Sequence, residues 1–261
     1  MQHPAVPGNT QSGFSLVELS IVILVMGLLL GGIALPLSQQ RDNARFSAAE
    51  QQLDDVQLAF EAYWLVNGSL PCPATPGSGG LSSPAAGGCT RQHGFVPATT
   101  LALPGNRNDD NLLLDPWGSP LRYSVSASDS NGNGSWDFLS VAEIGAVGIA
   151  ALTPELVVCR SAAGASAAGC GSPGDTVASA VPLLIYSLGK DWAGFSSADQ
   201  VENAGATVGG GPSGTSYRVP ANAVFVARNQ TAQAGNEYDD LLTWIPALKL
   251  YKGLLDAGHA P

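Results

Sequence analysis

The sequence predicts an α+β protein, in which a long N-terminal helix packs against an antiparallel β-sheet with long Gly/Pro-rich loops. Three observations predict this fold. An apolar run opens the chain, an amphipathic helical pattern follows it, and the remainder alternates short strand patterns with turn-forming residues. The 261 residues include 32 glycines and 18 prolines, and only 12% are charged. This composition is typical of a loop-rich exported domain rather than of a helical cytosolic enzyme.

The helix begins with an apolar run from Phe14 to Leu37, which is 24 residues long and uncharged from Leu19 onward. About 20 helical residues cross the hydrocarbon core of a bilayer, so residues 14–37 are predicted to span a membrane. A secretory signal peptide fits this segment poorly. Its apolar core has roughly 7–15 residues and its small-residue cleavage site follows that core, whereas Gly13 precedes the run.

One carboxylate, that of Glu18, lies near the start of this apolar run. An ionised acid costs a few kcal/mol at membrane depth, so such residues are usually functional. A purely structural interpretation places Glu18 at headgroup depth, where the positive end of the helix dipole stabilises it.

The stretch Gly13-Phe14-Ser-Leu-Val-Glu18-Leu, followed by an apolar helix, resembles the class III signal of type IV pilins and type II secretion pseudopilins. The resemblance implies that a prepilin peptidase removes the leader 1–13 after Gly13 and methylates Phe14. It also implies that Glu18 meets the N-terminal amine of a neighbouring subunit during assembly. The leader has no Lys or Arg, where leaders of this family are usually basic.

This resemblance also implies partners and a location. The partners would be prepilin peptidase, other pilin or pseudopilin subunits, an inner-membrane assembly platform and membrane lipid. The protein would be a single-pass inner-membrane protein with a periplasmic domain, and later part of a periplasmic or cell-surface filament.

Residues 38–66 are predicted to continue the helix as an amphipathic segment. Apolar residues recur there at spacings of three and four, which indicates one buried stripe: Phe46, Ala49, Leu53, Val56, Phe60 and Tyr63. Asn67-Gly68 is a helix stop signal.

Residues 67–261 are predicted to form one globular pilin-like domain. The segment Leu70–Asn111 is rich in Gly and Pro and should be irregular. The turn Asp115–Pro120 precedes a strand over Leu121–Val125, and this Asp-Pro-Trp-Gly-x-Pro turn resembles the one that starts the sheet of major pseudopilins. Loops rich in Gly, Ala and Ser are expected at Ser161–Asp175 and Asn203–Ser216, and a short helix after Pro246. Further strands are predicted at Trp136–Val141, Leu156–Cys159, Pro182–Leu188, Ala223–Ala227 and Leu241–Ile245.

Four cysteines allow three disulfide pairings. We favour Cys72 with Cys89 and Cys159 with Cys170, because each pair closes a short loop and an exported chain meets an oxidising compartment. The alternative, a zinc site, lacks any CxxC pair. The net charge of −10 excludes a typical nucleic-acid-binding protein, which needs clustered Lys and Arg.

Two loops carry candidate calcium ligands. Asp129, Asn131, Asn133 and Asp137 occupy positions 1, 3, 5 and 9 of an EF-hand-type loop with glycine at position 6. Position 12 is Ser140 instead of glutamate, and a plain Asx- and Gly-rich turn explains the same residues.

The second loop resembles the calcium-holding C-terminal loop of major pseudopilins. That resemblance implies ligands at Leu188, through its backbone carbonyl, and at Asp191, Asp239 and Asp240. The loop spans about 45 residues here, whereas the family's loop is short. Solvated acids that cap a strand would explain the same residues without a metal.

No catalytic motif is present in the sequence, so an enzyme is not expected. The hypothesis that the sequence favours is a prepilin-type filament subunit, and its size suggests a minor pilin or pseudopilin. The alternative is a membrane-anchored periplasmic protein, a calcium-dependent binding protein or adhesin that does not polymerise.

Overall fold

The structure is a computed structural model of the whole chain, and it describes residue 13 and residues 15–85, 88–167, 169–209 and 216–258. Side chains of residues 30–38 also lie outside the description. The chain divides into two compact units, Met1–Phe46 and Ser47–Pro261. The predicted leader 1–13 therefore lies almost wholly outside the described residues.

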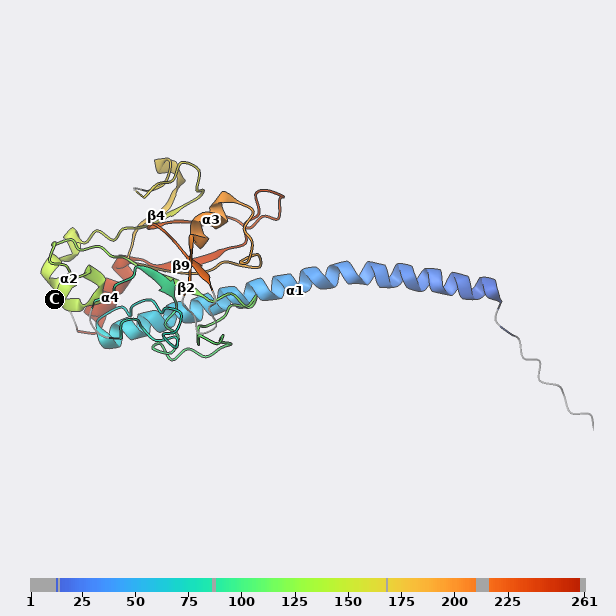
Figure 1. Cartoon of the computed structure of the whole chain (residues 1–261), viewed down its shortest axis with the longest axis horizontal. Coiled ribbons are helices and arrows are strands. Elements are labelled where there is room, and N and C mark those ends of the chain that lie inside the picture. The colour runs from blue at the N-terminus through green and yellow to red at the C-terminus, as the bar shows by residue number, and fades with distance from the viewer. Residues whose placement is uncertain (1–12, 14, 86–87, 168, 210–215, 259–261) are drawn as a thin grey trace, which may run out of the picture. The chain divides into compact units, whose positions relative to one another are not determined.

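Helix α1 covers Leu16–Asn67 and contains the two helical segments that the sequence predicts (Figure 1). It ends at the predicted stop, because Gly68 adopts φ +61° and its N–H donates to the carbonyl of Trp64 at 2.8 Å. A side chain at Gly68 would also meet Val141, since its Cβ would lie 2.7 Å from a methyl carbon of that residue. Glycine is therefore required at this turn.

The main sheet has strand order β1-β2-β5-β9, and all its neighbouring strands are antiparallel. Its strands are β1 (His93–Phe95), β2 (Arg122–Val125), β5 (Leu183–Ser187) and β9 (Leu241–Ile245). The sheet shares one core with the second part of α1, as predicted. The rings of Phe60 and Tyr123 pack 4.5 Å apart, and Leu183 and Ile185 lie in the same cluster.

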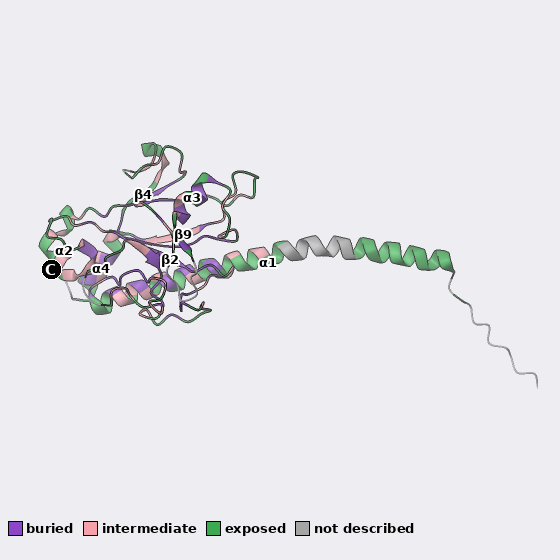
Figure 2. Ribbon diagram, in the orientation of Figure 1, coloured by how far each residue is buried: buried purple, intermediate pink, exposed green. Residues whose placement is uncertain are grey.

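The buried stripe of α1 is largely the predicted one, with one shift. Leu53, Val56 and Phe60 are buried, but the aromatic residue that continues the stripe is Trp64, while Tyr63 is only half-buried. Trp64 lies four residues after Phe60, on the same face of the helix. Its indole N–H donates to the carbonyl of Leu250 at 2.9 Å in helix α4 (Ala247–Asp256), the predicted closing helix. Figure 2 shows that buried and exposed residues alternate along the second part of α1.

A second sheet covers the other face of β5. It has the order β4-β3-β8, formed by β4 (Thr176–Val181), β3 (Leu156–Cys159) and β8 (Val224–Val226). Leu184 and Tyr186 of β5 pack against Val158 and Phe225 of this sheet. Strand β5 is thus buried on both faces. The pairing of β3 with β4 is antiparallel and that of β3 with β8 is parallel, so this second sheet is mixed, whereas the main sheet is antiparallel as expected.

The remaining elements are short. They are α2 (Val141–Val147), α3 (Ala198–Ala204), the strands β6 (Ala206–Val208) and β7 (Tyr217–Val219), and the 3₁₀ helices η1 (Asp137–Leu139), η2 (Ile149–Ala151) and η3 (Pro173–Asp175). Strand β6 lies within the segment 203–216, which the sequence predicts as loop. Strands β1, β4, β6 and β7 were not predicted, since three have only three residues and β4 has a largely exposed pattern.

The predicted strand at Trp136–Val141 is wrong. Residues Asp137–Leu139 form η1, and Ser140 then starts α2, because its hydroxyl accepts the backbone N–H of Glu143 at 3.2 Å. A short apolar run of this length does not distinguish a strand from helical turns, and the helix cap decides the matter here.

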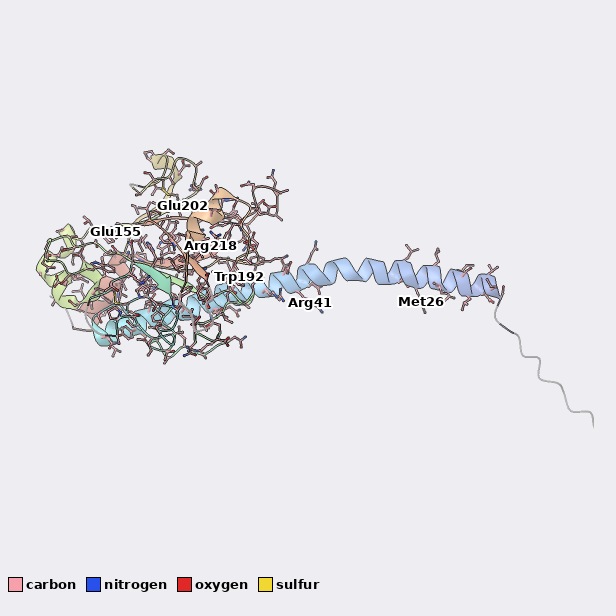
Figure 3. All side chains as sticks on the ribbon, viewed as in Figure 1. Met26, Arg41, Glu155, Trp192, Glu202 and Arg218 are labelled. Atoms are coloured by element: carbon pink, nitrogen blue, oxygen red, sulfur yellow. A yellow bond between two sulfur atoms is a disulfide. The ribbon has the colours of Figure 1, made fainter. Side chains whose placement is uncertain are left out.

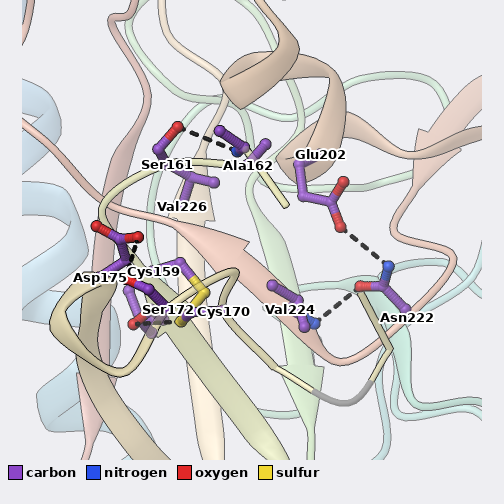
Figure 4. The surroundings of a disulfide bond; sticks show 12 residues. Cys159, Ser161, Ala162, Cys170, Ser172, Asp175, Glu202, Asn222, Val224 and Val226 are labelled. Carbon is purple, nitrogen blue, oxygen red and sulfur yellow. Dashed lines mark hydrogen bonds between the residues drawn. A yellow bond between two sulfur atoms is a disulfide. The ribbon is translucent and has the colours of Figure 1, made fainter. Parts of the chain in front are cut away.

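Both predicted disulfides are confirmed. Cys72 bonds to Cys89 and Cys159 bonds to Cys170, across 17 and 11 residues respectively. Figure 4 shows the second bond, which ties the end of β3 to the segment that leads into β4. Each closes a loop with little regular structure, where a cross-link stabilises mainly by restricting the unfolded chain.

The shared core predicts that alanine substitutions at two nearby positions of α1 have very different effects on stability. Phe60→Ala should destabilise the globular unit by roughly 3–5 kcal/mol, because a buried ring is replaced by a cavity. Leu58→Ala, at a position that is 61% exposed, should cost about 0.5 kcal/mol or less. Urea unfolding of the full chain in mild detergent, followed by tryptophan fluorescence, measures both. Equal costs would contradict the assignment of the buried face.

Candidate functional site

The start of α1 holds Glu18 in a defined position. The Ser15 hydroxyl accepts the backbone N–H of Val17 at 3.3 Å, and the Glu18 carboxylate accepts the backbone N–H of Ser15 at 3.2 Å. This reciprocal arrangement is a capping box, which satisfies free N–H groups at a helix start. It places the carboxylate beside the backbone of residue 15, directly after Phe14. The Ser-x-x-Glu spacing could have revealed the cap from sequence, but Phe14 lies outside the described residues.

The described side chains from Leu16 to Leu29 are exposed and almost all apolar. Their exposed fractions range from 44% at Val22 to 85% at Leu16 for the large apolar residues. Figure 3 shows Met26 projecting from this part of the helix. A contiguous apolar surface of this kind marks an interaction site. Among the described residues, no helix offers a stretch both long and apolar enough to cross a membrane.

Comparison with known proteins identifies what this helix resembles. Residues 8–34 match the family model of the prokaryotic N-terminal methylation motif, a range that includes Gly13, Phe14 and Glu18. The resemblance to prepilins is confirmed. The type II secretion system core protein G of Pseudomonas aeruginosa is 26% identical over 117 residues, which are 43% of this chain and 72% of that protein. No solved structure matches the chain. Both similarities indicate a structural pilin or pseudopilin type of protein and not an enzyme.

The first candidate calcium loop forms a compact turn that satisfies itself. The Asp129 carboxylate accepts the N–H groups of Asn133 at 3.0 Å and Gly134 at 2.7 Å. The side-chain oxygens of Asn131 and Asn133 accept N–H groups two residues further on, as in Asx turns. Most of the predicted ligands are therefore used within the loop itself.

Two further acids complete this turn. Asp137 is fully buried, and both of its carboxylate oxygens accept hydrogen bonds from Ser130, at 3.0 Å from the N–H and 2.7 Å from the hydroxyl. Glu143, which the EF-hand spacing places too far along the chain, reaches the loop from α2 and accepts the Asn133 amide at 2.8 Å. The helix cap at Ser140, described above, starts α2 and thereby places the Glu143 carboxylate beside the loop.

The second candidate site lies where β5 ends and β9 begins. It unites two of the four predicted residues, Asp191 and Asp239, across 48 positions of the sequence. Lys190 donates its backbone N–H to Asp239 at 2.7 Å. Gly189 permits this close approach, because it adopts φ +66° and a Cβ there would lie 2.5 Å from the Asp239 carbonyl oxygen.

The side chains of the other two predicted residues, Asp240 and Leu188, have different surroundings from this pair. Asp240 is only 3% exposed and accepts the side-chain amide of Asn203 at 2.7 Å, while its second oxygen, Oδ1, has no hydrogen-bond partner among the described residues. Burial raises the pKa of Asp240 well above its usual range. Leu188 follows β5, and its side chain is part of the core between the two sheets.

Gln200, which sequence reasoning did not single out, is the residue that completes the site. Its side-chain amide nitrogen lies 2.8 and 2.9 Å from the two oxygens of Asp191 and 3.0 Å from Oδ1 of Asp239. Each oxygen of the two carboxylates thus already accepts a hydrogen bond. Within the described part of the chain, no three His, Cys, Asp or Glu side chains gather closely enough to hold a metal. Calcium binding at either loop stays a prediction.

The pairing of Asp191 with Asp239 predicts a pH dependence. Burial, followed by the neighbouring Asp191, raises the pKa of Asp239 from 3.8 to about 7. The unfolded chain releases this proton near pH 3.8, whereas the folded protein keeps it until about pH 7. The stability from this group is therefore fully present below pH 3.8 and is lost as the pH rises to about 7.

Asp239→Asn should remove this loss of stability at higher pH, because the Asn side chain is neutral at every pH and its oxygen can still accept the Lys190 N–H. Its melting temperature should exceed that of the wild type at about pH 8, and the difference should shrink toward pH 4. Thermal unfolding at several pH values measures it, with the exposed Asp109→Asn as the control. A difference that does not change with pH would show that Asp239 is ionised throughout.

Proposed function

We propose that this protein is a prepilin-type filament subunit that prepilin peptidase cleaves after Gly13 and methylates at Phe14. The observation that carries the proposal is the start of α1. There an exposed apolar surface begins beside one carboxylate, that of Glu18, which caps the helix. The match to the N-terminal methylation motif over this segment supports it. The filament would be a type IV pilus or a type II secretion pseudopilus.

Assembly would bury the apolar surface between residues 16 and 29 against the same surface of other subunits. Removal of apolar area from water or lipid headgroups supplies the association energy, but it does not by itself define which subunits align. The carboxylate of Glu18 supplies that register. In a low-dielectric layer it is stable only beside a cation, and the amine released at Phe14 by cleavage is such a cation in the same layer.

The same proposal gives the partners and the location. The subunit would first lie in the bacterial inner membrane, with lipid around residues 14–37 and the globular unit in the periplasm. The assembly platform would then transfer it into the filament. Its two disulfides suit that oxidising compartment. The additional sheet and the long connections of the globular unit favour a minor subunit over the bulk one.

The role of Glu18 in register predicts different effects of two substitutions at the start of α1. Glu18→Gln can keep the capping box, because the Gln amide oxygen can still accept the Ser15 N–H, yet it removes the charge. We therefore expect normal cleavage but at least about a tenfold loss of filament incorporation, equivalent to about 1.4 kcal/mol of lost pairing. Ser15→Ala weakens the cap by roughly 0.5–2 kcal/mol and keeps the charge, so incorporation should persist.

The measurement is the ratio of subunit in sheared filaments to subunit in the membrane fraction of the native host. Glu50→Gln, an exposed acid further along α1, is the matched control. Normal incorporation of Glu18→Gln together with loss in Ser15→Ala would show that Glu18 acts only as a helix cap, and the register role would be wrong.

A further inference from the structure

The segment between Asp191 and Glu237 inserts a helix, α3, beside the C-terminal acids. This segment is 45 residues long, and the resemblance described above places a short metal-holding loop here. Its helix α3 presents Gln200 and Asn203, three residues apart and therefore on one face. Both side chains are 0% exposed, and both donate their amide groups to the acids in question.

Gln200 occupies the space between the two facing carboxylates. Its nitrogen lies within 3.0 Å of three of their four oxygens, and the Lys190 N–H serves the fourth. The orientation of the amide is supported by Ser197, the N-cap of α3, whose hydroxyl lies 3.3 Å from the Gln200 side-chain oxygen and also accepts the Gln200 backbone N–H. The donor side of the amide therefore faces the acids.

Asn203 ties the next acid to the second sheet. Its amide nitrogen lies 2.7 Å from Asp240 and 2.9 Å from the carbonyl of Val226, and its oxygen accepts the Val226 N–H at 2.7 Å. Helix α3 thus joins the start of β9 to β8 through one side chain. A buried carboxylate that accepts an amide hydrogen bond avoids much of the cost of burial.

We propose that α3 holds the C-terminal acidic loop with the side-chain amides of Gln200 and Asn203, in place of the cation that the resemblance implies, so that the loop folds without calcium. A calcium ion takes six to eight oxygen ligands, whereas the oxygens of Asp191 and Asp239 already accept N–H groups. The two amide hydrogens of Gln200 are shared among three of these oxygens.

The proposal concerns folding of the globular unit and does not depend on filament assembly. Thermal unfolding of the full chain in mild detergent, by tryptophan fluorescence, tests it with excess EGTA or with about 5 mM CaCl₂, which exceeds typical dissociation constants of extracellular calcium sites. We expect the wild-type melting temperature to be the same in both. Gln200→Ala should lower it by roughly 5 °C in EGTA, while the exposed control Gln233→Ala should not.

Calcium titration of the wild type by calorimetry keeps the test valid if Gln200→Ala fails to fold. A calcium-induced rise in melting temperature that Asp191→Asn abolishes would overturn the proposal, as would a Gln200→Ala variant as stable as Gln233→Ala. A calcium-induced rise in melting temperature that Asp129→Asn abolishes would place the ion in the loop of Asp129. That result would support the proposal that amides alone hold the loop of Asp191 and Asp239. Gln200→Glu, which adds a third carboxylate, should be less stable in EGTA and recover in calcium.

Discussion

The globular unit depends on the burial of one face of α1 against β2 and β5. Phe60 and Trp64 fill the space below the sheet, and the indole N–H of Trp64 reaches the closing helix α4. Strand β5 lies at the centre, because its alternate side chains enter this core on one face and the core of the second sheet on the other. Loss of this contact would remove the support of both sheets.

The two parts of α1 differ in how their apolar side chains are arranged. From Ser47 onward its apolar residues form a stripe that the protein itself covers, whereas the described residues before Leu29 expose apolar side chains in every direction. An exposed apolar surface of this extent is typical of an interaction site. In the proposed filament both properties would lie in one helix, and Glu18 would be the charged residue among the described residues 15–29 that aligns the exposed part.

Local patterns predicted the fold well where they were long or strongly alternating. The helical stripe, the stop at Gly68, and strands β3 and β9 follow from periodicity and turn residues. The strand expected at Trp136–Val141 failed because a cap at Ser140 outweighed a short apolar run. Asp191 and Asp239 were predicted by resemblance. The contact of Gln200 with Asp239, in contrast, joins the inserted helix α3 to a residue 39 positions further along the chain, and no local pattern reports such a contact.

The central claim is that Gly13 and Phe14 form a processing site and that the processed chain enters a filament. Mass spectrometry of the N-terminal peptide from sheared surface filaments of the native host tests it most directly, with a Gly13→Val strain as the control. The account predicts a methylated Phe14 terminus in the filaments and none in the control. An intact Met1 terminus, found only in the membrane fraction, would contradict it.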